Sequence, residues 1–503
     1  MSARARSAIV AIDQGTTGTT VLVVDRRGRI IGRAYSEFTQ HYPRPGWVEH
    51  DAEEIWRVTL RVVRGALRRA KVRAGDLAGI GITNQRETTV VWNRRTGRPI
   101  HPALVWQDRR TAPRCEGLRG QGATERVREA TGLVIDPYFS ATKIEWLLEH
   151  VRGARDSAAR GELCFGTIDT WLVWKLSGGR AHVTDRTNAS RTLLFNLRTL
   201  DWDPALAELF GVPREILPSV HPSIGVVAHT DPEVLGATVP IAGIAGDQQA
   251  ALVGQACFAT GTAKNTYGTG CFLLMPTGAE VVRTTRLLAT AAASAAAERA
   301  YAVEGSIFVA GAAVQWLRDG LGVIRKAAET EKLARSVSST LGVYVVPAFV
   351  GLGAPYWDAE ARGAVVGLTR GVERAHLARA VLEAIAYQTR DVVEAFAADA
   401  GKRLEILRVD GGAAANDFLM QFQADVLGVE VERPKVVETT GLGAAFLAGL
   451  GVGTWASPAE LEGLRHVDRR FKPRMSSAER EALYHGWMQA VSRVRTPSPV
   501  ASD

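Results

Sequence analysis

A short polar turn near the start of the chain carries the first residues that could do chemistry. Residues 13–19 read Asp-Gln-Gly-Thr-Thr-Gly-Thr and lie between two apolar runs, 8–12 and 21–24. Such runs around a Gly/Thr-rich turn predict a β-hairpin. The glycines, Gly18 among them, let backbone approach a ligand, and the threonine hydroxyls and free amides suit phosphate oxygens. Asp13, at the end of the first strand, is placed to hold a hydrated Mg²⁺. An ordinary hairpin turn is the alternative, and the chain has no Walker loop.

A second polar block follows the apolar run 77–82, which we expect to be a buried strand. It reads Thr-Asn-Gln-Arg-Glu-Thr-Thr over residues 83–89. Binding groups in α/β proteins gather at such strand ends. Arg86 and Glu87 put a donor fork beside an acceptor, which can grip neighbouring hydroxyls of a polyol. The alternative is a surface ion pair.

A carboxylate stands at a third strand end. The apolar run 241–245 is followed by Gly-Asp-Gln-Gln at 246–249 and then by the start of a helix. Asp247 is there both fixed and exposed enough to act on a substrate, although it could simply cap the helix. Further along, residues 264–275 repeat the strand, Thr/Gly turn, strand pattern. Two such turns suggest two related domains that face each other, each with one phosphate loop.

Three further segments give weaker signals of a ligand site. Trp106 follows an apolar run and is either a core residue or the wall of a ligand site. Tyr138 precedes a helix for which Ser140 is a candidate N-cap, so its hydroxyl can point into a cleft. The strand 405–409 ends in Asp-Gly-Gly, where paired glycines can let a flat adenosine lie on backbone.

Composition restricts the class of protein. The chain has 503 residues, 46% of them hydrophobic, and a formal charge of +8. This length suggests roughly two to four domains with large buried cores. The arginines are scattered, so a solvated cationic surface is favoured over a nucleic-acid site, and it would also favour an anionic substrate. The four cysteines form no C-x-x-C motif, which argues against a disulfide framework or a zinc site. We expect no signal peptide and no membrane span.

Several elements can be placed from local patterns. We expect Asp51 to cap a helix, with Glu54 completing a capping box. Residues 290–302 are Ala-rich and ambiguous between helix and strand. Helices are expected over 310–321 and 377–396, and a tightly packed one over 441–453. The tail after Thr496 is predicted to fray.

Taken together, these blocks resemble the FGGY carbohydrate kinase family over residues 7–494, and within it the branch that phosphorylates glycerol. The resemblance is carried by these segments: DQGTT (13–17), GITNQRETT (81–89), WQDRRT (106–111), TGLVIDPYFSATK (131–143), GIAGDQQAALVGQ (243–255), AKNTYGTGCF (263–272), PAFVGLGAPYWD (347–358) and LRVDGGAAANDFLMQFQAD (407–425). The NQRE and DPYFS blocks are similar to the glycerol branch rather than to its pentulose or gluconate relatives.

The resemblance implies an α/β fold of two actin/hexokinase-like (ribonuclease H-like) domains, whose mixed sheets flank a central cleft. It implies domains over 1–255, with the glycerol site and first phosphate loop, and 256–503, with the second phosphate loop and adenosine site. The implied reaction is ATP-dependent phosphorylation of glycerol to sn-glycerol 3-phosphate, in glycerol uptake and catabolism. A kinase for another small polyol or sugar is the alternative, and a non-enzymatic nucleotide-binding module is a third.

The resemblance also assigns roles residue by residue. Asp247 would be the general base and, with Asp13 acting through water, would hold Mg²⁺. The substrate-binding residues would be Arg86, Glu87, Trp106, Tyr138, Asp247, Gln248 and Phe272. The ATP-binding residues would be Thr16, Thr17, Gly18, Thr20, Thr269, Gly311, Gln315, Gly412 and Asn416.

One residue departs from the family pattern. Thr20 stands where the family usually has an arginine near the phosphates, and we expect Mg²⁺ or another cation to compensate.

The loop 231–239 has no histidine, so control by histidine phosphorylation is expected to be absent, and feedback by fructose 1,6-bisphosphate is in doubt. The expected partners are glycerol and ATP, without nucleic acid or membrane, in a cytoplasmic homo-oligomer (dimer or tetramer).

Overall fold

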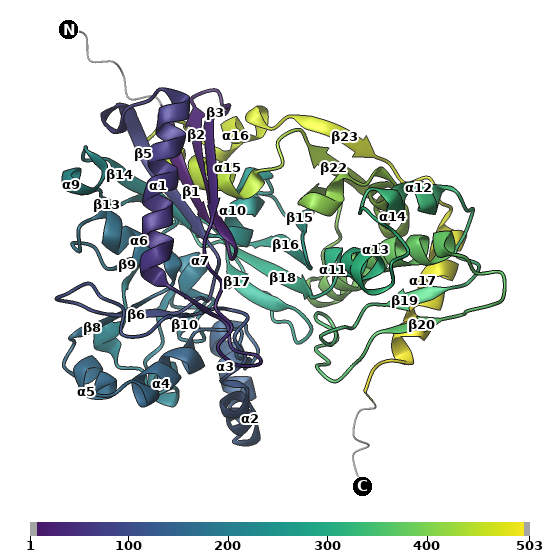
Figure 1. Cartoon of the computed structure of the whole chain (residues 1–503), viewed down its shortest axis with the longest axis horizontal. Helices are drawn as coiled ribbons and strands as arrows, with labels where there is room; N and C mark the ends of the chain where they lie inside the picture. Colours follow the sequence, from purple (N-terminus) through teal and green to yellow (C-terminus); the bar gives the residue numbers. More distant parts are fainter. Residues whose placement is uncertain (1–7, 497–503) are drawn as a thin grey trace.

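The structure, a computed structural model that describes residues 8–496, has two lobes, each built on one large mixed sheet (Figure 1). The first sheet has six strands in the order β13-β14-β5-β1-β2-β3. Strands β1 and β2 form the predicted hairpin, and β1 and β14 run parallel to β5. The bounds are β1 Ala8–Gln14, β2 Gly18–Asp25, β3 Ile30–Glu37, β5 Leu77–Asn84, β13 Ile224–His229 and β14 Pro240–Gly246.

The second sheet has seven strands in the order β17-β18-β16-β15-β21-β22-β23. Strands β15 and β16 form the second predicted hairpin, and β15 and β22 run parallel to β21. The bounds are β15 Thr262–Tyr267, β16 Cys271–Gly278, β17 Leu288–Ala291, β18 Tyr301–Ile307, β21 Ile406–Asp410, β22 Glu430–Pro434 and β23 Val467–Phe471. The expected α/β class with two mixed sheets is confirmed.

The two hairpins have matching turns. Gly15 N donates to Gly18 O at 2.9 Å in the first, and Gly268 N donates to Gly270 O at 2.8 Å in the second. Val10 and Ile12 of β1 are fully buried because helices cover both faces of the central strands. Each turn therefore projects from a rigid strand end.

Two glycine-containing helices connect the lobes. Helix α10 (Asp247–Gly254) follows β14, and α15 (Thr439–Gly451) follows β22. A Cβ on Gly254 would overlap the carbonyl of Thr439, and one on Gly443 would overlap the carbonyl of Ala250. The absence of side chains at these positions lets the two backbones touch. Helix α15 also packs on the first sheet, where Ala444 and Leu447 share a buried cluster with Ile9 and Leu22 of β1 and β2.

A smaller region lies below the first sheet in Figure 1 and carries α3 (Thr124–Thr131) and α4 (Ala141–His150), with Tyr138 in the loop between them. Its apolar cluster joins Leu133 and Phe139 to Leu288 and Tyr301 from the far edge of the second sheet. Strands β17 and β18 thus bring the second lobe against the first. The ambiguous stretch 290–302 is explained here, because β17 ends at Ala291, β18 starts at Tyr301 and no regular element lies between them.

Both predicted N-caps stand at the expected positions, but two of the expected capping contacts are absent. Asp51 caps α1 (Ala52–Ala70) by accepting from Glu53 N at 2.8 Å, but Glu54 does not close a capping box. Its carboxylate instead accepts from the amide and hydroxyl of Thr39, which anchors the loop after β3. Ser140 stands at the N-cap of α4 (Ala141–His150) without bonding a helix amide. Its hydroxyl donates to Glu87 O at 2.9 Å, so tertiary contact decides the role of both side chains.

The longer predicted helices are present. The expected helices over 377–396 and 441–453 correspond to α13 (Arg374–Ala400) and α15. The one over 310–321 is α11 (Gly311–Gln315), continued by a π-helical turn over Trp316–Gly320. The tail beyond Thr496 lies outside the described residues.

The remaining helices cover the sheets or the smaller region. They are α2 Ala112–Gly120, α3 Thr124–Thr131, α5 Ala154–Ala159, α6 Ile168–Leu176, α7 Arg186–Ala189, α8 Pro204–Leu209, α9 Pro232–Leu235, α12 Glu329–Arg335, α14 Asp417–Leu427, α16 Pro458–Leu464 and α17 Ser477–Ser492. Short strand pairs are β4 (Glu49–His50) with β7 (Ala103–Leu104), β6 (Val90–Asn93) with β8 (Leu163–Gly166), β9 (Val183–Asp185) with β12 (Ser219–His221), β10 (Phe195–Asn196) with β11 (Asp201–Trp202), and β19 (Tyr344–Val346) with β20 (Ala364–Val366).

All four cysteines are buried and none forms a disulfide, as expected from their spacing. Among residues 8–496, no helix has the length and apolar character needed to cross a bilayer.

Candidate active site

Arg86 and Glu87 follow β5 and are buried, with 3% and 1% of each residue exposed, so they are not a surface ion pair. Glu87 adopts φ +61°, a conformation that costs a non-glycine residue free energy. Two hydroxyls hold it there, since Ser140 and Thr89 both donate to Glu87 O, at 2.9 and 3.1 Å. The strained turn aims both charged side chains toward the second lobe.

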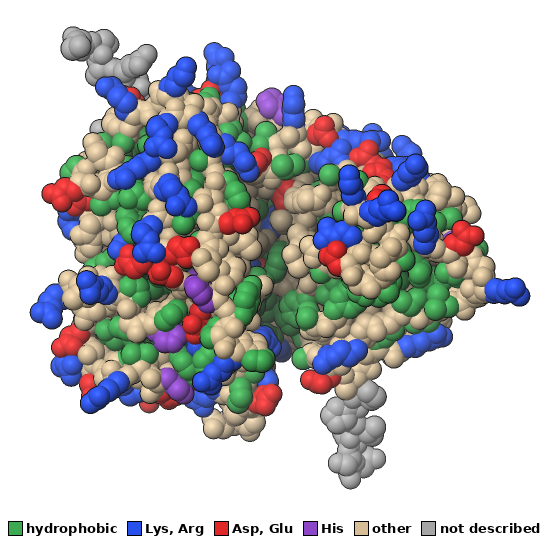
Figure 2. Space-filling model, viewed as in Figure 1, with side chains coloured by type: hydrophobic (Ala, Val, Ile, Leu, Met, Phe, Trp, Pro, Cys, Tyr) green, Lys and Arg blue, Asp and Glu red, His purple; other side chains and the backbone are tan. Residues whose placement is uncertain are grey.

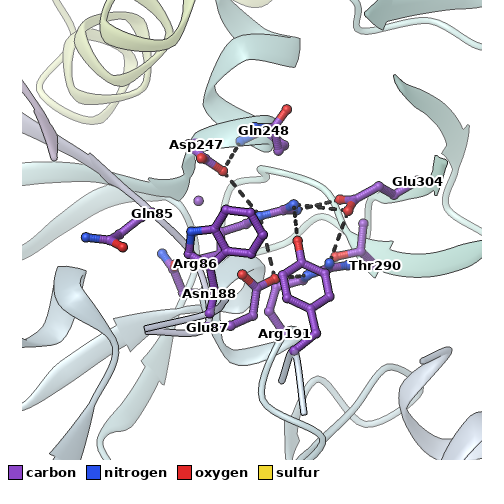
Figure 3. A network of polar contacts seen from close by, with 12 residues as sticks. Gln85, Arg86, Glu87, Asn188, Arg191, Asp247, Gln248, Thr290 and Glu304 are labelled. Carbon is purple, nitrogen blue, oxygen red and sulfur yellow. Dashed lines mark hydrogen bonds and ion pairs between the residues drawn. The ribbon is translucent and has the colours of Figure 1, made fainter. Parts of the chain in front are cut away.

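The Arg86 guanidinium is engaged on every side (Figure 3). Its two terminal nitrogens lie 2.5 and 3.0 Å from the two oxygens of Glu304 in β18, a bidentate pair. Its Nε lies 3.2 Å from Asp247 Oδ1. Nη2 also donates to the Tyr138 hydroxyl at 3.4 Å. Arg86 therefore links a carboxylate of each lobe.

Arg191, just beyond α7, completes a ring of four charges. Its Nε donates to Glu87 Oε1 at 2.7 Å, and its Nη2 donates to Glu304 Oε1 at 3.1 Å. Each carboxylate thus contacts both arginines, with Arg86 Nε 3.8 Å from Glu87 Oε1. Burial works against the charge on Glu304, but Arg191 and Arg86 outweigh it and lower its pKa to about 2. Glu304 is therefore ionised at neutral pH.

Asp247 is the first residue of α10 and follows β14 directly. Its Oδ1 accepts from Gln248 N at 2.7 Å, which is a capping contact, while 29% of its side chain stays accessible. Burial raises its pKa above the ordinary range, although Arg86 and Lys264 oppose the shift. Asp247 both begins the helix and presents a basic carboxylate to a ligand.

Asp13 lies close to Asp247. Burial raises the pKa of Asp13 to about 7, and the negative charge of Asp247 adds to the shift. Two carboxylates that repel each other in a sheltered site favour a cation between them. Within the described residues, no cluster of three or more His, Cys, Asp or Glu side chains could enclose a metal by itself. Magnesium needs no such cluster, because it commonly binds one or two carboxylates together with substrate phosphates and water.

Lys264 in β15 is a buried cation beside these carboxylates. Its ammonium donates to Gln248 Oε1, to Thr266 Oγ1 at 3.0 Å and to Phe272 O at 3.0 Å. Burial lowers its pKa to about 8, against the opposing charges of Asp410, Asp247 and Glu304. Lys264 thereby joins Gln248 to Phe272, two of the residues expected from the sequence.

Trp106 lies at the site rather than in the core. Its indole Nε1 donates to Thr16 Oγ1 at 2.9 Å, and its ring meets the Tyr138 ring edge-on with centroids 5.6 Å apart. The aromatic pair therefore bridges the first hairpin turn and the loop of the smaller region. Thr16, Trp106, Tyr138, Arg86, Asp247 and Gln248 form one continuous set of contacts.

The candidate phosphate turns present threonines at the surface. Thr17 and Thr269 are exposed at the two hairpin turns. Gly18 is packed against Tyr35, where a Cβ would clash with the ring. Thr20 pairs with Asp13 across β1 and β2, so both side chains are on the same face of the sheet. This brings Thr20 near the carboxylate expected to hold the metal.

The candidate nucleotide residues belong to the second lobe. Gly311 begins α11 in backbone contact with Gly268, and Gln315 on the same helix is exposed. Gly412 has open space where a side chain would stand, and Asn416 caps α14 by accepting from Leu419 N at 3.0 Å. In the described part of the chain, no hydrogen bond or ion pair joins these four residues to the ring of four charges around Arg86. Figure 2 shows the surface hollowed between the lobes that carry the two groups, with Lys and Arg spread over both.

Sequence reasoning missed three charged residues of the site: Arg191, Lys264 and Glu304. One signal was available for Glu304, which interrupts the apolar run 301–309, since a carboxylate in a buried strand requires a partner. Arg191 gave no such local signal, because the ring that contains it is formed by distant segments.

Comparison with known proteins was made on sequence and on structure. Residues 8–254 match the model of the N-terminal domain of the FGGY family of carbohydrate kinases, and residues 263–452 match the C-terminal one. The chain is 57% identical over 486 residues to a glycerol kinase of Caldanaerobacter subterraneus subsp. tengcongensis, covering 96% of this chain and 98% of that protein. It is 59% identical over 488 residues to the glycerol kinase of Symbiobacterium thermophilum, covering 97% and 98%.

Solved structures agree with this similarity. The crystal structure of Plasmodium falciparum glycerol kinase with ADP matches with a TM-score of 0.93 at 36% identity, covering 98% of this chain and 99% of that one. A ligand-bound xylulose kinase of Lactobacillus acidophilus matches with a TM-score of 0.88 at 21% identity, covering 97% of each chain, which shows a shared fold.

Proposed function

This chain belongs to the FGGY family of carbohydrate kinases, and on that premise we propose that it transfers the γ-phosphoryl group of ATP to a terminal hydroxyl of glycerol, giving sn-glycerol 3-phosphate and ADP. The observation that carries this proposal is the grouping of Arg86, Tyr138 and Asp247, since the Arg86 guanidinium lies 3.4 Å from the Tyr138 hydroxyl and 3.2 Å from Asp247 Oδ1. Donors and acceptors packed this closely suit a small molecule that is almost all hydroxyl.

Asp247 is the proposed general base. It takes the proton of the attacking hydroxyl while the oxygen bonds to the γ-phosphorus and the bond to the β–γ bridging oxygen breaks. Its raised pKa suits this role, because a more basic carboxylate accepts the proton more readily. Arg86 beside it holds the substrate hydroxyl in line with the phosphorus.

The remaining substrate contacts follow from the same geometry. Glu87 and Gln248 accept or donate to the other hydroxyls, and Trp106 and Phe272 cover the carbon edge of glycerol. Trp106 is suited to this because its indole is already fixed by Thr16 at 2.9 Å. Closure of the cleft then excludes water, which would otherwise compete as the nucleophile.

ATP is proposed to lie between the two hairpin turns. Thr16, Thr17, Gly18 and Thr20 hold phosphates from one lobe and Thr269 from the other, while the adenosine lies against Gly311, Gln315, Gly412 and Asn416. Mg²⁺, held by Asp13 through water and by Asp247, would neutralise charge on the phosphates. The electrostatic repulsion between these two carboxylates supports a cation there.

The wider setting is proposed with the reaction. We place the protein in the cytoplasm, in glycerol uptake and catabolism, as a homo-oligomer (dimer or tetramer) without nucleic acid. We also propose that the domains divide at 255/256, near the boundary between the two family matches. Light scattering on the purified protein tests the oligomeric state.

A coupled assay that follows ADP release from MgATP tests the reaction. Glycerol is expected to give the highest kcat/KM in a panel with xylulose, ribulose, erythritol and gluconate. Turnover of another polyol at a higher kcat/KM would favour the alternative, a kinase for that polyol. ATP binding without turnover of any panel member would favour a non-enzymatic module.

A further inference from the structure

The ring of Arg86, Glu87, Arg191 and Glu304 contains two residues that the proposed function leaves without a role. Arg191 and Glu304 are both completely buried, and they lie behind Arg86 and Glu87 as seen from Asp247 (Figure 3). Their contacts to the two residues proposed to grip glycerol are 2.5 to 3.0 Å long. Buried ions with no solvent contact must be compensated by one another.

Orientation is the first effect of this second pair. Glu304 holds both terminal nitrogens of Arg86, and Gln249 Oε1 accepts from one of them at 3.3 Å. The fork therefore cannot turn, and its Nε edge stays directed at Asp247. Arg191 occupies one oxygen of Glu87, Oε1, so the other oxygen is the one left to a substrate.

Charge is the second effect. The ring contains two cations and two anions, and Glu304 is ionised because the arginines lower its pKa. Without Glu304, the ring would hold two arginines and one glutamate, so the Arg86 fork would belong to a group with net positive charge, which attracts carboxylates in a bidentate manner. With Glu304, the same fork offers hydrogen bonds and no net charge.

We propose that Glu304 and Arg191 are positioning residues that make the site selective for an uncharged triol over three-carbon acids of the same size. The inference rests on the proposed function and adds the class of molecule that the site rejects. Glycerate tests it, because it differs from glycerol by one oxidised carbon and is an anion at neutral pH.

The experiment compares Glu304→Gln with wild type at pH 7.5, using the KM for glycerol and the competitive inhibition constant of D-glycerate. The variant keeps the size of the side chain and removes one negative charge. We expect the KM for glycerol to rise about tenfold and the inhibition constant of glycerate to fall about fivefold, since the ring would then carry a net positive charge, which favours an anionic partner. A structural defect alone would weaken the binding of both molecules.

Glu383→Gln is the matched control. Glu383 is also a buried carboxylate paired with an arginine, at 2.7 Å from Arg379, but it lies on α13 outside the ring. The control is expected to lower thermal stability without moving the ratio of the glycerol KM to the glycerate inhibition constant.

Two further variants keep the test decisive if Glu304→Gln does not fold. Glu304→Asp retains the charge, so discrimination against glycerate is expected to persist even where the KM for glycerol rises. Arg191→Gln removes a cation, so glycerate binding is expected to weaken further. The proposal is overturned if the glycerate constant is unchanged in Glu304→Gln, or if glycerol and glycerate weaken in proportion in every ring variant. Failure of wild type to phosphorylate glycerol would instead overturn the proposed function.

Discussion

Neighbouring strands pair in the same order of parallel and antiparallel directions in the two sheets. The residues that follow corresponding strands nevertheless differ, since they are charged in one lobe and glycines in the other. From β3 to β13 in the first lobe and from β18 to β23 in the second, neighbouring strands pair antiparallel, antiparallel, parallel, parallel and antiparallel. After β5 the first lobe has Arg86 and Glu87, whereas after β21 the second has Gly411 and Gly412. Under the proposed function, the fold would fix where a ligand lies, and the residue after the strand would decide whether side chains or backbone contact it.

The same contrast extends to backbone conformation. Glu87 and Gly411 both have positive φ, +61° and +85°. In the first lobe a charged residue is held in that strained conformation by the hydroxyls of Ser140 and Thr89. In the second, glycine adopts it without strain and leaves open space at Gly412. A polyol site needs aimed charges, whereas a flat base needs room.

Removing the base should have the largest effect. Asp247→Asn keeps the shape of the side chain but cannot accept a proton, so kcat is expected to fall about 10²- to 10⁴-fold. ATP binding, measured by titration calorimetry without Mg²⁺, is expected to stay within about twofold of wild type, because Asp247 is proposed to reach the nucleotide only through the metal. Full turnover in this variant would remove the general-base role.

Arg86→Ala tests whether the first lobe selects glycerol by side chains. The KM for glycerol is expected to rise about 100-fold, because a buried charged partner of the substrate is lost. Glu304, left with Arg191 as its one remaining arginine partner, should also lower the free energy of unfolding by about 3–5 kcal/mol.

Tyr138→Phe is the milder companion, since it removes one hydroxyl and no charge. Steady-state kinetics measure the effect of each variant on the glycerol KM, and thermal melts measure its effect on stability. A glycerol KM that is unchanged in Arg86→Ala would reject the contact.

Gly443→Ala tests the contact between the two halves. The added methyl would overlap the Ala250 carbonyl on α10, so the free energy of unfolding is expected to fall by about 1–3 kcal/mol. Gly463→Ala in α16 is the control, because no atom lies within 4 Å of its Cβ. Chemical denaturation compares the two variants. Equal free energies of unfolding for Gly443→Ala and Gly463→Ala would mean that α10 and α15 can move apart without cost.

Gly412→Ala sharpens the contrast at the second lobe. No atom lies within 4 Å of the new Cβ, so stability is expected to stay within about 0.5 kcal/mol of wild type. The methyl would occupy space proposed for the adenosine, so the KM for ATP is expected to rise about fivefold. An unchanged KM for ATP, with kcat also unchanged, would place the nucleotide elsewhere.

Thr20→Arg should have the smallest effect. If Mg²⁺ or another cation already supplies the charge that the family arginine provides, ATP affinity is expected to change by less than about threefold. Lys264, buried beside Asp247, is one cation present in the site. Much tighter ATP binding by Thr20→Arg would show that no compensation exists.

The sequence predicted the elements more completely than the contacts between them. Apolar runs and glycine turns placed β1, β2, β5, β14, β15 and β16, because hydrophobic periodicity is a local property. Thr16, Trp106, Tyr138, Arg86, Asp247 and Gln248 were expected to meet and do so. Glu54 and Ser140 were misassigned because their partners, Thr39 and Glu87, come from other loops. Glu304 and Arg191 were missed for the same reason, since only the tertiary fold brings the ring together.

Helix α15 has a consequence for how the protein is made. Residues 439–451 complete the apolar face of a sheet whose own strands end at residue 246. During synthesis, Ile9 and Leu22 of the first lobe therefore stay uncovered until almost the whole chain has left the ribosome. An N-terminal fragment that ends at residue 255 is therefore expected to be aggregation-prone, and adding residues 439–451 as a separate peptide is expected to restore its solubility.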